Sequence, residues 1–189
     1  VLRMVQAVND PSMVNLGAAV ADPDFQPVAQ MERAFRTVLR EQRRRCVGYE
    51  FPPGAPELRA GLARRLAALR CPVSPEEILI TNSCQESVAI ALRMLTKPGD
   101  TVAIESPTYY GLLQVIESLG LNALEIPTDP IRGLSLEALS LALERWPVAA
   151  CVVVPNFSNP LGTCMPDERK QALLRLLGEY DVPLVEDDI

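Results

Sequence analysis

The 189-residue sequence contains no histidine, and lysine occurs only twice, as Lys97 and Lys170. The lack of histidine excludes His-dependent catalytic triads, Cys–His dyads and the commonest protein metal ligand. The five cysteines include no C-x-x-C pair, so the sequence indicates neither a disulfide framework nor a zinc site. We therefore expect reduced thiols and no bound metal.

A basic excess and a long apolar run are also missing. The net charge of −6 argues against a nucleic-acid-binding surface on this chain, because such surfaces need an excess of Lys and Arg. No apolar run approaches the roughly 20 residues that cross a bilayer, and we expect no leader peptide because the chain does not open on a basic and then apolar segment. With 48% hydrophobic residues the composition is that of a folded protein, and we expect it in the cytoplasm, with no membrane partner.

Hydrophobic periodicity divides the chain into an irregular start and a regular remainder. Residues 1–27 lack sustained periodicity and are predicted to form an arm or linker, whereas helical spacing begins at Val28. From residue 78 onward, short apolar strands alternate with helices. The predicted strands are 78–81, 101–105, 123–126, 149–154 and 183–187. The helices predicted between and after them are 86–95, 112–119, 136–143 and 167–180. Two further helices are predicted earlier in the chain, at 28–45 and 58–69.

This alternation predicts an α/β domain of three layers, α/β/α, with a mainly parallel sheet covered on both faces. In such sheets ligands bind beyond the carboxyl ends of the strands. The function is therefore sought in the residues that follow each strand.

Small polar residues follow the first predicted strand, in the order Thr-Asn-Ser-Cys-Gln-Glu at 81–86. At a helix N-terminus such residues form an anion site, commonly for phosphate, although a plain N-cap has the same composition. The second strand is followed by Tyr109 and Tyr110, which suit stacking on a planar ring or packing under a loop. Asn156 and Asn159 follow the fourth strand, in a loop rich in Pro and Gly.

The last strand ends in Glu186, Asp187 and Asp188. Because side chains alternate along a strand, Asp187 is predicted to face opposite to its two acidic neighbours. A magnesium-holding strand of a nucleotide hydrolase would end similarly, but the chain has no phosphate-binding loop of the G-x-x-x-x-G-K type. A receiver-type phosphoacceptor pocket would place its acidic pair near the first strand.

Taken in order, these motifs resemble one family. The chain is similar to the N-terminal half of the aminotransferase domain of pyridoxal-phosphate-dependent proteins of fold type I, class I/II, and most resembles the effector domain of MocR-type regulators of the GntR family. The resemblance implies an incomplete large domain over 28–189, with its C-terminal remainder and any DNA-binding domain outside this chain. The segments that carry it are 49–54 with Leu58 and Arg59, 78–81 with Gln85, 98–100 and 105–109, Pro155 to Gly162, and 185–189.

The resemblance implies roles around the ring of pyridoxal 5′-phosphate. Asp187 resembles the aspartate that pairs with the pyridinium nitrogen, which must stay protonated for the cofactor to act as an electron sink. Asn159 resembles the amide that binds the phenolic oxygen of the ring and borders the substrate. Tyr109 resembles the stacking ring and, with Asp187, is a catalytic candidate.

The resemblance also implies a phosphate cup and a dimer. Ser83, Cys84 and Gln85 match the cup, although the family usually has glycine at the position of Ser83. Tyr49 resembles the tyrosine that reaches the phosphate of the neighbouring subunit, which implies a homodimer. Gly17 corresponds to the backbone that meets the substrate carboxylate.

The lysine that carries the cofactor in this family has no counterpart in the chain. Lys97 precedes a predicted strand and is therefore expected at the amino end of the sheet, opposite to the predicted site. Lys170 is expected on a surface helix. The segment alone is therefore expected to be inactive, and whether the whole protein is an enzyme stays open at this point.

Three functions fit this resemblance. The first is the domain of a transcriptional regulator that senses a small amino compound or pyridoxal phosphate, with DNA bound only through a domain outside this chain. The second is a free-standing aminotransferase that moves an amino group between an amino acid and a 2-oxo acid. The third is a decayed copy that only oligomerises.

Overall fold

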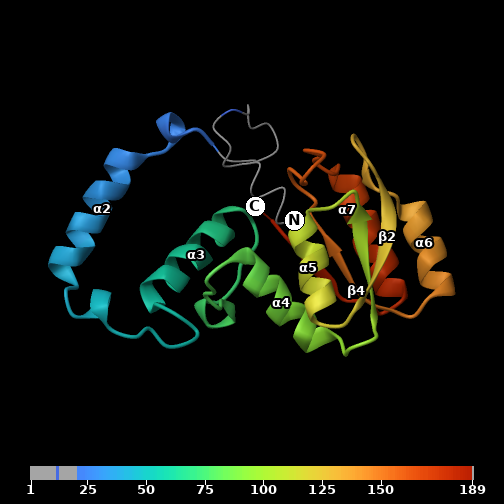
Figure 1. The fold of residues 1–189 in the computed structure, drawn as a ribbon, viewed down its shortest axis with the longest axis horizontal. Coiled ribbons are helices and arrows are strands. Elements are labelled where there is room, and N and C mark those ends of the chain that lie inside the picture. The colour runs from blue at the N-terminus through green and yellow to red at the C-terminus, as the bar shows by residue number, and fades with distance from the viewer. Residues whose placement is uncertain (1–11, 13–20, 189) are drawn as a thin grey trace. The chain divides into compact units, whose positions relative to one another are not determined.

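The computed structural model describes residue 12 and residues 21–188, and the chain divides into two compact units at Ile80 and Thr81. Figure 1 shows the elements of both units. Within residues 21–188 no helix is both long enough and apolar enough to cross a membrane.

The first unit is built around two helices, α2 (Val28–Glu41) and α3 (Pro56–Ala68), as helical periodicity predicted. Short 3-10 helices lie before, between and after them: η1 (Pro23–Phe25), η2 (Arg45–Val47) and η3 (Pro75–Glu77). None of the residues of α2 is buried, and α2 exposes Val28, Met31, Phe35, Val38 and Leu39. The apolar stripe of this helix is therefore uncovered among the described residues.

Arg59 and Gly54 hold the loops on either side of α3 in place. The Arg59 guanidinium donates to the carbonyls of Gly54, at 3.1 Å, and Pro75, at 2.7 Å. Gly54 has a φ of +99°, and a β-carbon there would lie 2.6 Å from the side chain of Ile80. Only glycine satisfies both the positive φ and this close approach.

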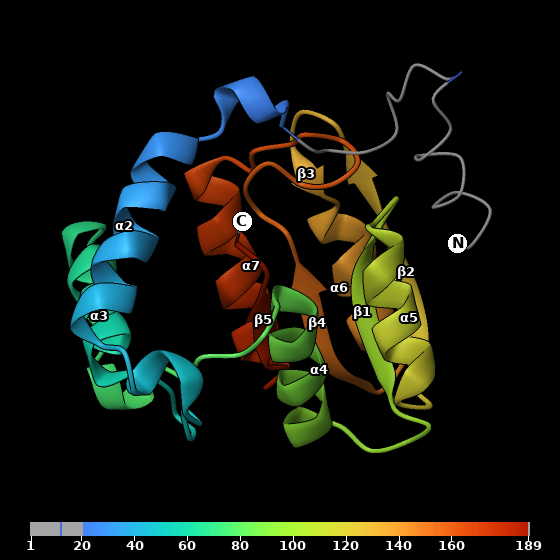
Figure 2. The same cartoon turned by 60° about the vertical axis from the view of Figure 1, so that its left-hand side comes forward.

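The second unit contains a five-stranded sheet in the order β3-β2-β1-β4-β5, as Figure 2 shows. Strand β1 pairs in parallel with β2 and β4, and β4 pairs in parallel with β5, while β3 pairs antiparallel with β2. The mainly parallel sheet is therefore confirmed. The strands are β1 (Thr101–Ser106), β2 (Asn122–Asp129), β3 (Gly133–Leu134), β4 (Val148–Val153) and β5 (Leu184–Glu186).

Helices cover both faces of this sheet (Figures 1 and 2). Val102 and Ile104 of β1 face a cluster with α4 and α5, whereas Ala103 faces a second cluster with α6 and α7. This alternation is the two-residue period of a strand buried on both sides, and it confirms the three layers. The helices are α4 (Cys84–Leu95), α5 (Tyr110–Ser118), α6 (Leu136–Arg145) and α7 (Asp167–Glu179).

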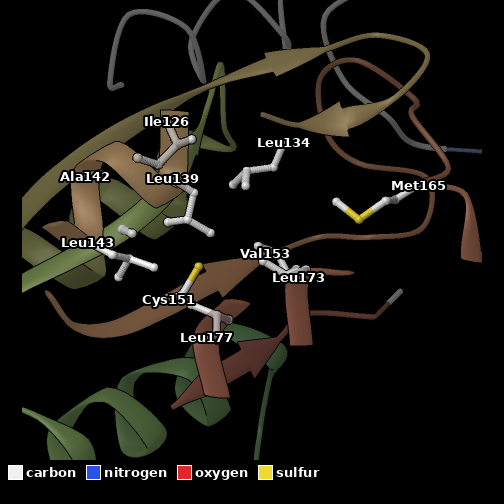
Figure 3. Close-up of a cluster of buried hydrophobic side chains, with 11 residues drawn as sticks. Ile126, Leu134, Leu139, Ala142, Leu143, Cys151, Val153, Met165, Leu173 and Leu177 are labelled. Carbon is white, nitrogen blue, oxygen red and sulfur yellow. The ribbon is translucent and has the colours of Figure 1, made fainter. Parts of the chain in front are cut away.

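The larger apolar core lies between the sheet and helices α6 and α7 (Figure 3). Leucines from both helices meet aliphatic side chains of β1, β2, β3 and β4. Its buried members are Ala103, Ile126, Leu134, Leu139, Ala142, Leu143, Cys151, Val153, Met165, Leu173 and Leu177.

Two sequence predictions about local structure were wrong. Residues 78–81 form no strand, because the Ile80 amide donates to Pro53 within a loop instead of to a neighbouring strand. The nearly all-apolar sequence of the helix at 86–95 predicts deep burial, but only Val88 and Leu92 of α4 are buried among its residues, and Met94 is 82% exposed. The short strand β3 was not predicted, because two residues carry no detectable period.

Candidate functional site

The start of α4, the loop after β1 and the residues after β5 meet at the carboxyl edge of the parallel strands. The contact that joins two of them runs from the Cys84 thiol to the Asp187 carboxylate, with Sγ 2.8 Å from Oδ1. The Asp187 amide donates to the carbonyl of Val153 at 2.9 Å, so its backbone continues the ladder between β4 and β5. This edge is where parallel sheets bind ligands.

Helix α4 begins at this edge, and the amides of its first turn have no hydrogen-bond acceptor within the helix. Ser83 is the N-cap, and its hydroxyl accepts a hydrogen bond from the Glu86 amide. The Glu86 carboxylate is held by Asn82, whose backbone and side-chain nitrogens donate to it at 2.6 and 3.0 Å. The amides of Cys84 and Gln85 lie in the first turn and have no intrahelical acceptor, so they suit an anion.

Gln85 and Tyr109 crowd around Gly111 at the start of α5. A methyl group built at Gly111 would overlap Gln85 Nε2 and the Tyr109 ring, so both side chains pack directly on this glycine. The Tyr109 and Tyr110 ring centroids lie 4.6 Å apart. A hydrogen bond with Tyr110, and burial, raise the pKa of Tyr109 above its usual value, so its ring stays a neutral phenol. A neutral, positioned ring is suited to stacking.

Asp187 is half-buried, whereas Glu186 and Asp188 are exposed. This confirms the predicted alternation of the three acids. The hydrogen bond with Asp187 is the main reason that the pKa of the Cys84 thiol rises to about 11, so the thiol is protonated at neutral pH.

The loop after β4 is tied to two other elements through Asn156. Asn156 Nδ2 donates to Asp188 Oδ1 at 2.9 Å, and Lys170 Nζ on α7 donates to Asn156 Oδ1 at 2.8 Å. Lys170 lies on a helix, as expected, and its partly buried ammonium anchors this loop. Asn159 lies half-buried in the same loop. The two asparagines were the sequence signal for this loop, but the lysine that anchors it was missed.

The two remaining candidate residues are Tyr49 and Gly17. Tyr49 belongs to the first unit and is 94% exposed there. Gly17 lies outside the described residues. Lys97 precedes the turn that enters β1, at the amino end of the strand, as the sequence indicated.

Glu105 is a buried carboxyl group that sequence analysis did not single out. It is 3% exposed on β1, and its Oε2 accepts a hydrogen bond from the Val154 amide at 2.8 Å, directly before the Asn156 loop. Burial raises the pKa of Glu105 above its usual value of 4.5. The carboxyl group thus fixes the chain that leaves β4 towards the candidate site.

Replacing Glu105 with glutamine should make stability less dependent on pH. A carboxyl group whose pKa is higher in the folded than in the unfolded state contributes most stability when protonated and loses that contribution as pH rises above the unfolded value. Glutamine keeps an acceptor for Val154 and does not titrate. The free energy of unfolding of E105Q relative to wild type, from urea unfolding at several pH values, should increase as pH rises above about 4.5. A constant difference would contradict the assignment.

Comparison with known proteins identifies the family. The model of the aminotransferase class I and II family matches residues 11–189, so the chain belongs to this family. It is 41% identical to the uncharacterized HTH-type transcriptional regulator YdcR and 40% identical to the uncharacterized HTH-type transcriptional regulator YjiR, both of Escherichia coli K12, over 100% of this chain. The chain spans 40% of the length of each of these relatives.

Solved structures agree with this assignment. Kynurenine aminotransferase of Pyrococcus horikoshii, determined in complex with PMP, superimposes with a TM-score of 0.89 at 27% identity, covering 99% of this chain and 47% of that one. The family indicates pyridoxal phosphate as the cofactor.

The residues at the carboxyl edge fit this cofactor. The first-turn amides of α4 match a phosphate, the Tyr109 ring beside Gly111 matches a planar ring, and the half-buried Asp187 matches a ring nitrogen that carries a proton. The contacts of Cys84 with Asp187, and of Gln85 and Tyr109 with Gly111, place these three groups on neighbouring segments.

Proposed function

We propose that this chain is part of the pyridoxal-phosphate-binding domain of an HTH-type transcriptional regulator that senses a small amino compound or pyridoxal phosphate itself. Its identity of 40–41% to two HTH-type regulators, over its whole length, supports the regulator. The observation that most supports a cofactor site is the contact between Cys84, at the start of α4, and Asp187, after β5.

Different residues of this chain would bind different parts of the cofactor. Ser83, Cys84 and Gln85 would bind the phosphate through the first turn of α4, where the helix dipole adds to the amide hydrogen bonds. Tyr109 would stack on the ring, and Asn159 would bind its phenolic oxygen.

Asp187 would hold a proton on the ring nitrogen. When bound, pyridoxal phosphate would supply an electron sink for negative charge that develops on a substrate carbon, provided that this nitrogen is protonated. A carboxylate within hydrogen-bond reach, partly shielded from water, favours the protonated nitrogen. Tyr49 would contact the phosphate held by a neighbouring copy in a homodimer, and Gly17 would meet the substrate carboxylate.

A free-standing aminotransferase is the second candidate, because it would use the same site and because the P. horikoshii enzyme shares the fold. DNA binding separates the two, since this chain has a net charge of −6 and a regulator would need a further domain that binds DNA.

The test combines cofactor and DNA binding in the full-length protein. We expect saturable binding of pyridoxal phosphate, followed by absorbance, and specific binding of promoter DNA whose affinity changes at least about threefold with an amino compound. Continuous transamination without DNA binding would establish the alternative. Failure to bind pyridoxal phosphate would exclude both.

A further inference from the structure

The contact between Cys84 and Asp187 joins residues 103 positions apart in the sequence, at the start of α4 and directly after β5. Cys84 is the first residue of α4, directly after the Ser83 cap. The Asp187 amide is bonded to the Val153 carbonyl. The thiol thus contacts one carboxylate oxygen of Asp187, while the Asp187 backbone is held by Val153.

The thiol is the donor in this contact. An ionised carboxylate only accepts hydrogen bonds, and the raised pKa of Cys84, about 11, keeps the proton on sulfur at neutral pH. Cys84 is therefore a poor nucleophile, since the thiolate is the reactive form. Oδ1 accepts this hydrogen bond, and among the described residues no donor to Oδ2 is found, so Oδ2 can accept from a second donor.

We propose that Cys84 is a positioning residue, whose thiol orients the Asp187 carboxylate so that its free oxygen meets the ring nitrogen of the cofactor. This inference rests on the proposed function, because it assigns Asp187 to the cofactor. Cys84 would then act through two groups: its backbone amide would bind the phosphate, and its side chain would orient Asp187.

Affinity for pyridoxal phosphate, measured by titration of the full-length protein, tests the coupling. C84A should bind about three- to tenfold more weakly than wild type, whereas C84S, which keeps a donor, should bind within about twofold. In a D187A background the C84A change should have little further effect, because Cys84 acts through Asp187. Wild-type affinity in C84A, or additive losses in the double variant, would overturn the proposal.

Alkylation of Cys84 tests the contact without cofactor. Its rate of reaction with iodoacetamide near pH 8, resolved by mass spectrometry, should rise at least about tenfold in D187N, because the charge that keeps the thiol protonated is removed. The exposed Cys46 and Cys164 are internal references that should not change. An unchanged Cys84 rate overturns the proposal, whereas a wild-type protein that fails to bind pyridoxal phosphate overturns the proposed function instead.

Discussion

Replacing Asp187 with alanine should weaken binding of pyridoxal phosphate to the full-length protein by about 30- to 1,000-fold. Removing one partner of a shielded, hydrogen-bonded charge pair costs about 2–4 kcal/mol, which corresponds to this range of dissociation constants. Any transamination by the full-length protein should also be lost, because the ring nitrogen would no longer be held in its protonated form. Absorbance titration measures the first effect and amino-group transfer the second.

Glu186 provides the matched control, because it is adjacent, equally acidic and exposed. Glu186→Ala removes the same charge from the same strand end but points to the other side, so its affinity for the cofactor should stay within about twofold of wild type. Equal losses in the two variants would indicate a general effect of negative charge and contradict the role given to Asp187.

Leu139→Ala should be the most destabilising single change considered for the second unit. Leu139 on α6 is fully buried in the core between the sheet and α7 (Figure 3). Truncating a buried leucine to alanine costs about 2–5 kcal/mol, from lost burial and from the cavity left behind. Hydrogen exchange of β4 and α6 in the full-length protein should accelerate correspondingly.

Leu141 on the same helix is the control for this prediction. It is 45% exposed, so Leu141→Ala should change the free energy of unfolding by no more than about 0.5 kcal/mol. Similar effects at the two positions would contradict the burial of Leu139 and the packing of α6 on the sheet.

Most elements of the second unit could be predicted, because their periods are long enough to detect. Strands β1 and β4 are apolar on both faces, and α7 runs over thirteen residues with an apolar stripe. Residues 78–81 were mistaken for a strand because three consecutive apolar residues resemble one. Strand formation also requires a partner, and the Ile80 amide finds its acceptor in the Pro53 loop.

The sequence was sufficient to predict which residues belong to the candidate site, but not which side chains contact one another. The start of α4 was assigned to the site through a predicted strand at 78–81 that does not form. The carboxyl-edge rule itself places Asp187 and the loop after β1 at one edge. It does not place the thiol of Cys84 on Asp187, because that contact depends on rotamers and on the exact start of α4. The bond from Lys170 to Asn156 was not predictable for the same reason, since it depends on the path of an irregular loop.

The crystal structure of the full-length protein with pyridoxal phosphate tests the central claim most directly. The account predicts the phosphate at the first turn of α4, the ring against Tyr109 and the ring nitrogen about 2.6–3.2 Å from an Asp187 oxygen. A cofactor bound elsewhere, or one whose ring nitrogen faces away from Asp187, would contradict it.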